Sequence, residues 1–207
     1  MKKLLLSIIA VAALFISAQA QITFGPKVGL NLANVAGDNT EDAEMKMGLQ
    51  IGVVTDIAFS DALSLQTGVM FSQKGSKDEF DRVNLNYLEI PINAVFGIDV
   101  GSNKLQFFAG PYLGIGLNGK ISRDLFDEDT DIQFGNDIMD VDDGKTPFNR
   151  FDIGLNAGVG YKINNIQIQA NYGLGLSNLI PKFDSEASED KISNGVMQLS
   201  VAYFFGN

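Results

Sequence analysis

The sequence contains no cysteine, histidine or tryptophan among its 207 residues. Without cysteine the chain forms no disulfide and offers no thiol nucleophile or thiolate metal ligand. Without histidine it cannot build a Ser–His hydrolase site, and it lacks the commonest ligand of transition metals. Catalysis by a carboxylate pair would need an enclosed cleft. We therefore expect no enzyme and no cofactor.

Basic residues are also scarce, with 15 lysines and arginines against 25 aspartates and glutamates. The formal net charge is −10. Nucleic-acid binding needs clustered lysine and arginine to contact phosphates, so we expect no nucleic-acid partner.

The first twenty residues are typical of a cleavable secretory signal peptide. The short basic start Met1-Lys2-Lys3 precedes an apolar run over 4–17, and Ala18-Gln19-Ala20 follows as a small-x-small cleavage site. The apolar run is shorter than the ~20 residues of a membrane-spanning helix. We predict a signal peptide over 1–20 and one mature domain over 21–207.

The mature chain has no long apolar run, and its apolar residues recur at every second position. Over 151–163 one face is polar or small, whereas the other consists of Phe151, Ile153, Leu155, Ala157, Val159, Tyr161 and Ile163. This period of two predicts β-strands with one apolar face. Eight such segments are present, over 22–32, 47–59, 63–74, 84–100, 105–117, 150–163, 166–177 and 195–205.

The predicted strands and their connections match an outer-membrane barrel. Most of the strands are as long as the ~9–11 residues that a tilted strand needs to cross a bilayer. Tight turns alternate with long loops over 33–46, 75–83, 118–149 and 178–194. These four loops contain 20 of the 25 acidic residues. Short turns on one side and long loops on the other predict an eight-stranded antiparallel up-and-down barrel, with acidic loops outside the cell.

A secreted barrel or sandwich with its apolar face inward is the alternative. Two patterns disfavour it. The apolar stripes lack charges, as a lipid-facing surface requires, because an Arg or Lys at the bilayer midplane costs ~2–4 kcal/mol. Phenylalanines also lie near the strand ends on the apolar face, as an interfacial aromatic belt would. They are Phe24, Phe59, Phe71, Phe107, Phe151 and Phe205.

The opposite face then lines a narrow lumen, which in an eight-stranded barrel is just filled by side chains. We expect four charged residues there, Lys27, Lys74, Glu89 and Asp152. Charges in so confined a space need partners, so Glu89 should pair with an inward lysine or arginine. Both a structural set of ion pairs and an ion or proton path are compatible with this pattern.

Three prolines lie within predicted strands, where each removes a ladder hydrogen bond. They are Pro26, Pro91 and Pro111. We expect β-bulges or local breaks in the ladder at these positions.

Several short motifs resemble those of the PorT-like porin family. Residues 86–91 (NYLEIP) are similar to the YLEIP strand of that family. Residues 29–32, 71–75, 110–114 and 152–160 resemble, in order, its first, third, fifth and sixth strands. The resemblance implies an outer-membrane β-barrel domain and, for most members, no defined activity.

Two other motifs match known binding loops poorly. Residues 114–119 fit G-x-G-x-x-G, but no helix is expected after them, so a dinucleotide site is rejected. Asp127, Asp129 and Asp131 resemble the start of a calcium loop. Ile132 and Ile138 then stand where an EF-hand has Gly and Glu, so only a weak divalent-ion site remains. Apolar residues within 118–149 predict partial order in this loop.

These observations predict a small outer-membrane barrel with a structural or surface-interaction role. The expected partners are membrane lipid, lipopolysaccharide, divalent cations at the loops, and other envelope proteins. A porin-like channel for small solutes and an accessory role in a protein-secretion machinery are the alternatives.

Overall fold

The structure, a computed structural model, describes residues 21–37, 43–79, 81–123, 128–135, 144–181 and 191–206. The predicted signal peptide over 1–20 lies outside these ranges and stays a prediction.

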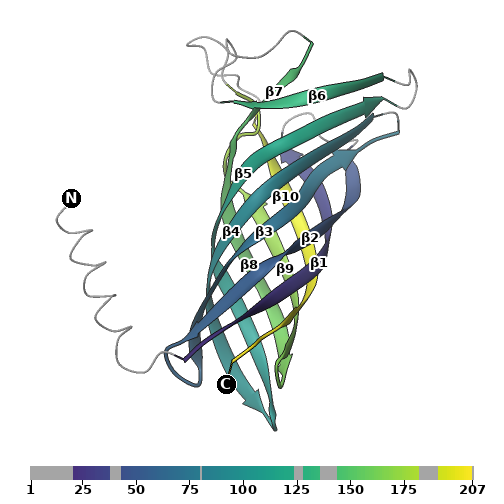
Figure 1. The fold of residues 1–207 in the computed structure, drawn as a ribbon. Coiled ribbons are helices and arrows are strands. Elements are labelled where there is room, and N and C mark those ends of the chain that lie inside the picture. The colour runs from purple at the N-terminus through teal and green to yellow at the C-terminus, as the bar shows by residue number, and fades with distance from the viewer. Residues whose placement is uncertain are drawn as a thin grey trace, which may run out of the picture.

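Eight long strands form one closed antiparallel ring, as predicted (Figure 1). The ring consists of β1 (Gln21–Gly37), β2 (Glu44–Ala58), β3 (Leu63–Lys77), β4 (Asp81–Val100), β5 (Asn103–Arg123), β8 (Phe151–Ile163), β9 (Ile166–Gly175) and β10 (Ile192–Tyr203). β1 pairs with β10, with Lys27 opposite Ala202, and β4 pairs with β5. These two contacts join strands that would otherwise end the sheet, so the ring has no free edge.

No helix among the described residues has the length and apolar character of a membrane-spanning segment.

The two faces of the strands separate apolar from polar side chains. In β8, Ile153 and Leu155 point outward and are 50% and 51% exposed, whereas Asp152 and Asn156 point inward and are buried. The same alternation runs through β9. Of the predicted belt phenylalanines, all but the half-buried Phe71 are exposed on the outer surface. The outward face therefore matches a surface that contacts lipid.

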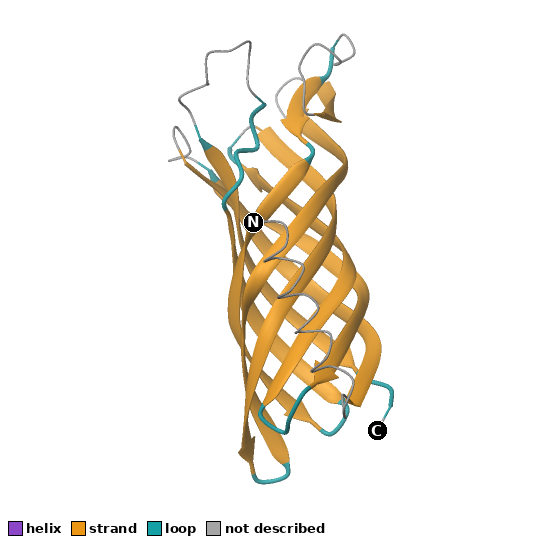
Figure 2. Cartoon of the chain, turned by 90° about the vertical axis from the view of Figure 1, so that its left-hand side faces the viewer, coloured by secondary structure: helices purple, strands orange, loops and turns teal. Residues whose placement is uncertain are grey.

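The strands extend farther than predicted at the long-loop end (Figure 2). β5 reaches Arg123 and β4 begins at Asp81, so the predicted loop over 75–83 is mostly paired strand. Antiparallel pairing needs only hydrogen-bond partners, which these polar residues also offer, so the ladder continues beyond the apolar band. Two further strands, β6 (Glu128–Gly135) and β7 (Thr146–Asn149), lie within the predicted partly ordered loop over 118–149.

The ladder is interrupted beside each of the three prolines. Pairing of β1 with β10 stops at Lys27 and resumes only as a single bridge between Phe24 and Phe205, so Pro26 lies in the gap. Pro91 lies in a gap between β3 and β4, and Pro111 in a gap between β4 and β5. The predicted local breaks are confirmed, while the two register shifts lie elsewhere, in the β2–β3 and β4–β5 pairs.

The two faces can be tested with neighbouring residues of β8. Leu155→Arg should block membrane assembly, because it places a charge in lipid at a cost of ~2–4 kcal/mol. Asn156→Ser, which faces the lumen, should assemble normally. Migration of unheated and boiled samples on a gel measures assembly, and equal tolerance of both changes would contradict the assigned faces.

Candidate functional site

A buried ion-pair cluster lies inside the barrel, between β3, β4 and β8. The Nζ atom of Lys74 is 2.6 Å from Oε2 of Glu89 and 3.1 Å from Oδ2 of Asp152. All three side chains are at most 3% exposed. The predicted partner of Glu89 is therefore Lys74, whose single ammonium group is shared by two carboxylates.

Aromatic and amide groups complete the surroundings of the cluster. Asp152 accepts hydrogen bonds from the hydroxyl of Tyr112 at 3.3 Å and from Nδ2 of Asn194 at 2.9 Å. The Lys74 ammonium lies 4.3 Å from the centre of the Tyr112 ring, a cation–π geometry. Gly154 makes room for this ring, because a Cβ there would lie 2.4 Å from Cε1 of Tyr112. Each charge in the cluster is thus met by a charged or polar neighbour.

Lys27 lies apart from this cluster and uses a neutral partner. Its Nζ atom donates to Oε1 of Gln169 at 2.7 Å, and among the described residues it makes no ion pair with a carboxylate. With Lys27 included, the four predicted lumen residues carry two positive and two negative charges. The formal charges of these four side chains therefore sum to zero, although only Lys74 is in direct contact with the carboxylates.

In the half of the lumen nearer the short turns, buried amide and carboxylate side chains form a chain of hydrogen bonds. Gln66 donates to Oδ2 of Asp56 and to Oε1 of Gln167, both at 3.3 Å, and Gln167 donates to Oε1 of Gln106 at 2.8 Å. All four side chains are buried. Together with the ion-pair cluster, they occupy the barrel along much of its length.

An apolar cluster, which we call the lid, lies above the ion pairs at the long-loop end. Its buried members are Leu85, Tyr87, Ile132, Phe134 and Leu179. Phe134 of β6 packs against Tyr87 of the barrel, with ring centres 5.5 Å apart. The backbone carbonyl of Phe134 accepts a hydrogen bond from Arg150 at 3.0 Å, which ties β6 to the start of β8.

The sequence analysis did not identify the lid. Its available signal was the alternation of Ile132 with Phe134, a period of two inside a region assigned to a loop. The inward position of Tyr87 and Tyr112 also follows from strand periodicity, but their roles beside Lys74 depend on the pairing register.

The predicted calcium-like motif does not form a ligand set among the described residues. Asp127 lies outside the described ranges. Asp129 and Asp131 are exposed on β6, and Oδ2 of Asp129 is 2.7 Å from Nζ of Lys120. In the part of the chain that the structure describes, no three acidic residues are close enough to hold a metal ion.

Comparison with known proteins places this architecture in a family. The model of the outer membrane protein beta-barrel domain family matches residues 17–181. The chain belongs to this family. Membership implies a location in the outer membrane. In outer-membrane barrels the short turns generally face the periplasm and the long loops face the outside of the cell.

The barrel is also similar to solved structures. The attachment invasion locus protein Ail of Yersinia pestis is 16% identical, with 89% of this chain and 99% of Ail covered and a TM-score of 0.45. Neisserial surface protein A is 15% identical, with coverages of 88% and 97% and a TM-score of 0.48. The N-terminal barrel of Pseudomonas aeruginosa OprF is 10% identical, with coverages of 90% and 100% and a TM-score of 0.39. No curated protein matches the chain. At these values the similarity supports no functional argument.

The ion-pair cluster predicts that one single substitution lowers the free energy of unfolding far more than three combined substitutions do. Lys74→Met should lower the free energy of unfolding by about 3–5 kcal/mol, because it leaves two carboxylates buried without their cation. Adding Glu89→Gln and Asp152→Asn should recover most of that loss. Urea unfolding of the refolded barrel measures both, with the exposed Lys77→Met as a near-neutral control. A single variant as stable as wild type would contradict the cluster's role.

The exposed pair of Lys120 and Asp129 predicts a pH effect at the outer end. Leu117 is the last exposed apolar residue of β5, so the pair lies beyond the apolar band. The hydrogen bond from Lys120 lowers the pKa of Asp129 below its ordinary value of 3.8. The pair's support of β6 should therefore persist above that value and disappear as pH falls through the lowered pKa. NMR titration of the Asp129 carboxyl should show the low midpoint, and Lys120→Met should raise it.

Proposed function

We propose that this protein is a closed outer-membrane barrel that acts through its outer surface, in a structural or surface-interaction role. The proposal rests on one observation, the filling of the lumen by buried side chains. Conduction needs a continuous path for ions and water through the barrel. Lys74 and Asp152, which form one of the buried ion pairs, are 1% and 0% exposed, so no water-sized space lies beside them.

The lid adds a second barrier to solutes. Leu85, Tyr87 and Leu179 are fully buried there, and the Tyr87 hydroxyl is the single polar group among their side chains. A solute entering from outside would have to displace this apolar packing before it met the ion pairs. Two different kinds of barrier in series support a closed barrel.

The outer rim supports a role in surface contacts. Exposed ion pairs join Lys77 to Glu44 at 3.1 Å and Lys120 to Asp129 at 2.7 Å. The sequence places most acidic residues in the same outer region. We propose that this mixed but mainly acidic rim contacts lipopolysaccharide through bridging divalent cations, or other envelope proteins. The lipid-facing surface contacts membrane lipid.

The proposal includes no catalytic step and no cofactor. The chain lacks histidine and cysteine, and the buried carboxylates of Glu89 and Asp152 are paired with Lys74. We also keep the narrower assignment to the PorT-like porins as a proposal, supported by the ordered strand motifs. A secretion role would require a partner protein, which co-purification would identify.

Planar-bilayer conductance tests the closed lumen. Wild-type protein should give no steady current steps. A variant hollowed by Lys74→Ala, Glu89→Ala and Asp152→Ala should give small steps, which shows that the assay detects an opening. Lys77→Ala with Glu44→Ala changes a similar pair on the exposed rim and should behave like wild type. Steady, ion-selective steps from wild-type protein would overturn the proposal in favour of the channel.

A further inference from the structure

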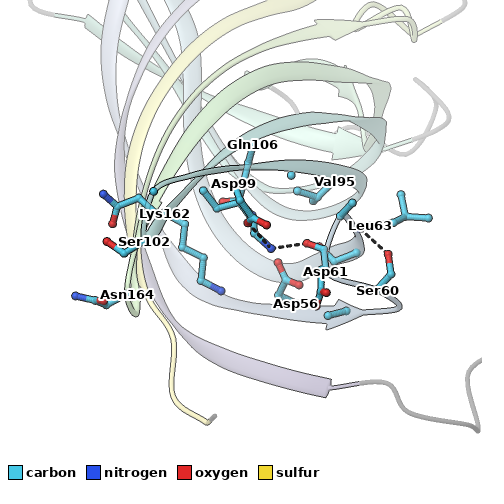
Figure 3. A pocket seen from close by; sticks show the side chains of 17 residues that line it. Asp56, Ser60, Asp61, Leu63, Val95, Asp99, Ser102, Gln106, Lys162 and Asn164 are labelled. Carbon is cyan, nitrogen blue, oxygen red and sulfur yellow. Dashed lines mark hydrogen bonds and ion pairs between the residues drawn. The ribbon is translucent and has the colours of Figure 1, made fainter.

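The periplasmic end of the barrel contains a polar cavity that the closed-barrel role does not use. It has a volume of about 280 Å³ and lies between the turns that join β2 to β3, β4 to β5, and β8 to β9 (Figure 3). An adjoining cavity of about 240 Å³ shares Asp56, Lys104 and Lys162 with it. We call this combined space the vestibule. Its size is near the lower end of small-molecule pockets, about 300–1,000 Å³.

A buried carboxylate with a free oxygen points into the vestibule. Asp56 on β2 is 5% exposed and lines both cavities. Its Oδ2 atom accepts one hydrogen bond, from Gln66 at 3.3 Å, whereas Oδ1 has no hydrogen-bond partner among the described residues. A carboxylate this deeply buried ordinarily has a cationic or multiply hydrogen-bonded partner. The geometry therefore leaves a place for a donor from a ligand.

An ammonium group without a carboxylate partner lies across the vestibule. Lys162 comes from β8, which is separated from β2 by β1, β10 and β9 in the ring. Its Nζ atom lies 4.9 Å from the centre of the Phe204 ring, and it forms no ion pair with an acidic residue of the described chain. The side chain of Lys162 points into the same space as that of Asp56 (Figure 3).

The second lysine of the vestibule already has partners. Lys104 contacts Asp99, with Nζ 3.5 Å from Oδ1, and donates to the backbone carbonyl of Asp61. It thus ties two turns together at the rim of the vestibule. Asp61 also lines both cavities, but its side chain is exposed on the turn. Asp56 is therefore the buried carboxylate of the vestibule without an ion pair, and Lys162 is its half-buried ammonium group without one.

We propose that the vestibule binds a small zwitterion, an amino acid or a dipeptide, from the periplasm. The ammonium group of the ligand would pair with Asp56, and its carboxylate would pair with Lys162. A ligand with both charges satisfies both side chains at once, which an amine or an acid alone cannot do. A metal ion fits less well, since no three acidic residues among those described are close enough to bind one.

Binding of alanine and alanyl-alanine to the refolded barrel tests the proposal, measured by titration calorimetry. Two further probes each lack one of the two charges. Alanyl-alanine amide lacks the carboxylate, and N-acetyl-alanyl-alanine lacks the ammonium group. Each should bind wild-type protein about tenfold more weakly than alanyl-alanine, because one charge-assisted contact is lost. Comparison of alanine with alanyl-alanine shows whether the site takes a free amino acid or a peptide.

Variants show which side chain contacts which charged group of the ligand. Asp56→Asn should no longer distinguish alanyl-alanine from its N-acetyl form, and Lys162→Met should no longer distinguish it from the amide. Asp129→Asn and Lys120→Met make the same changes at the outer end and should bind like wild type. A wild-type barrel that binds neither alanine nor the dipeptide, or binds all probes equally, would overturn the proposal. The probe comparison decides it even where a variant fails to assemble.

Discussion

The closure of the sheet on itself is the constraint on which the other features of this barrel depend. Hydrocarbon offers no hydrogen bonds, so every backbone amide and carbonyl within the membrane must find its partner in the protein. The pairing of β1 with β10 and of β4 with β5 closes the ladder into a ring, with interruptions beside the three prolines. Eight strands are a small number for such a closure, and they enclose a space only as wide as the side chains within it.

The polar interior follows from that geometry. With the apolar face turned toward lipid, alternation along each strand directs its polar face into a narrow space. Lys74 then has no access to water, and Glu89 and Asp152 supply the compensating charges. Small residues are equally necessary, since Gly154 leaves the volume that the Tyr112 ring occupies. The lumen is thus a packed polar core, in which charge balance replaces the solvation that water provides elsewhere.

Strand periodicity was enough to predict the ring, because each face of a strand can be assigned from local sequence. The alternation over 151–163 predicts β8 almost to the residue, and it places Asp152 inside. The partner of Glu89 could be predicted only as a class, because the choice of Lys74 depends on the register between β3 and β4, in which Lys74 lies opposite Leu85. The lid and the vestibule were not predicted. They form where β6 or the short turns meet distant strands, and such contacts have no periodic signal.

The two ends of the barrel differ in how they are closed. The outer end is covered by the apolar lid, whereas the vestibule opens at the end with the short turns. Beyond the vestibule, Gln106 and Gln167 are hydrogen-bonded to each other and buried. In the closed barrel that we propose, the interior is a cavity open at one end rather than a channel. Under this proposal, a ligand that enters the cavity leaves by the same opening, so the fraction of barrels that hold a ligand depends on its periplasmic concentration alone and not on any gradient across the outer membrane.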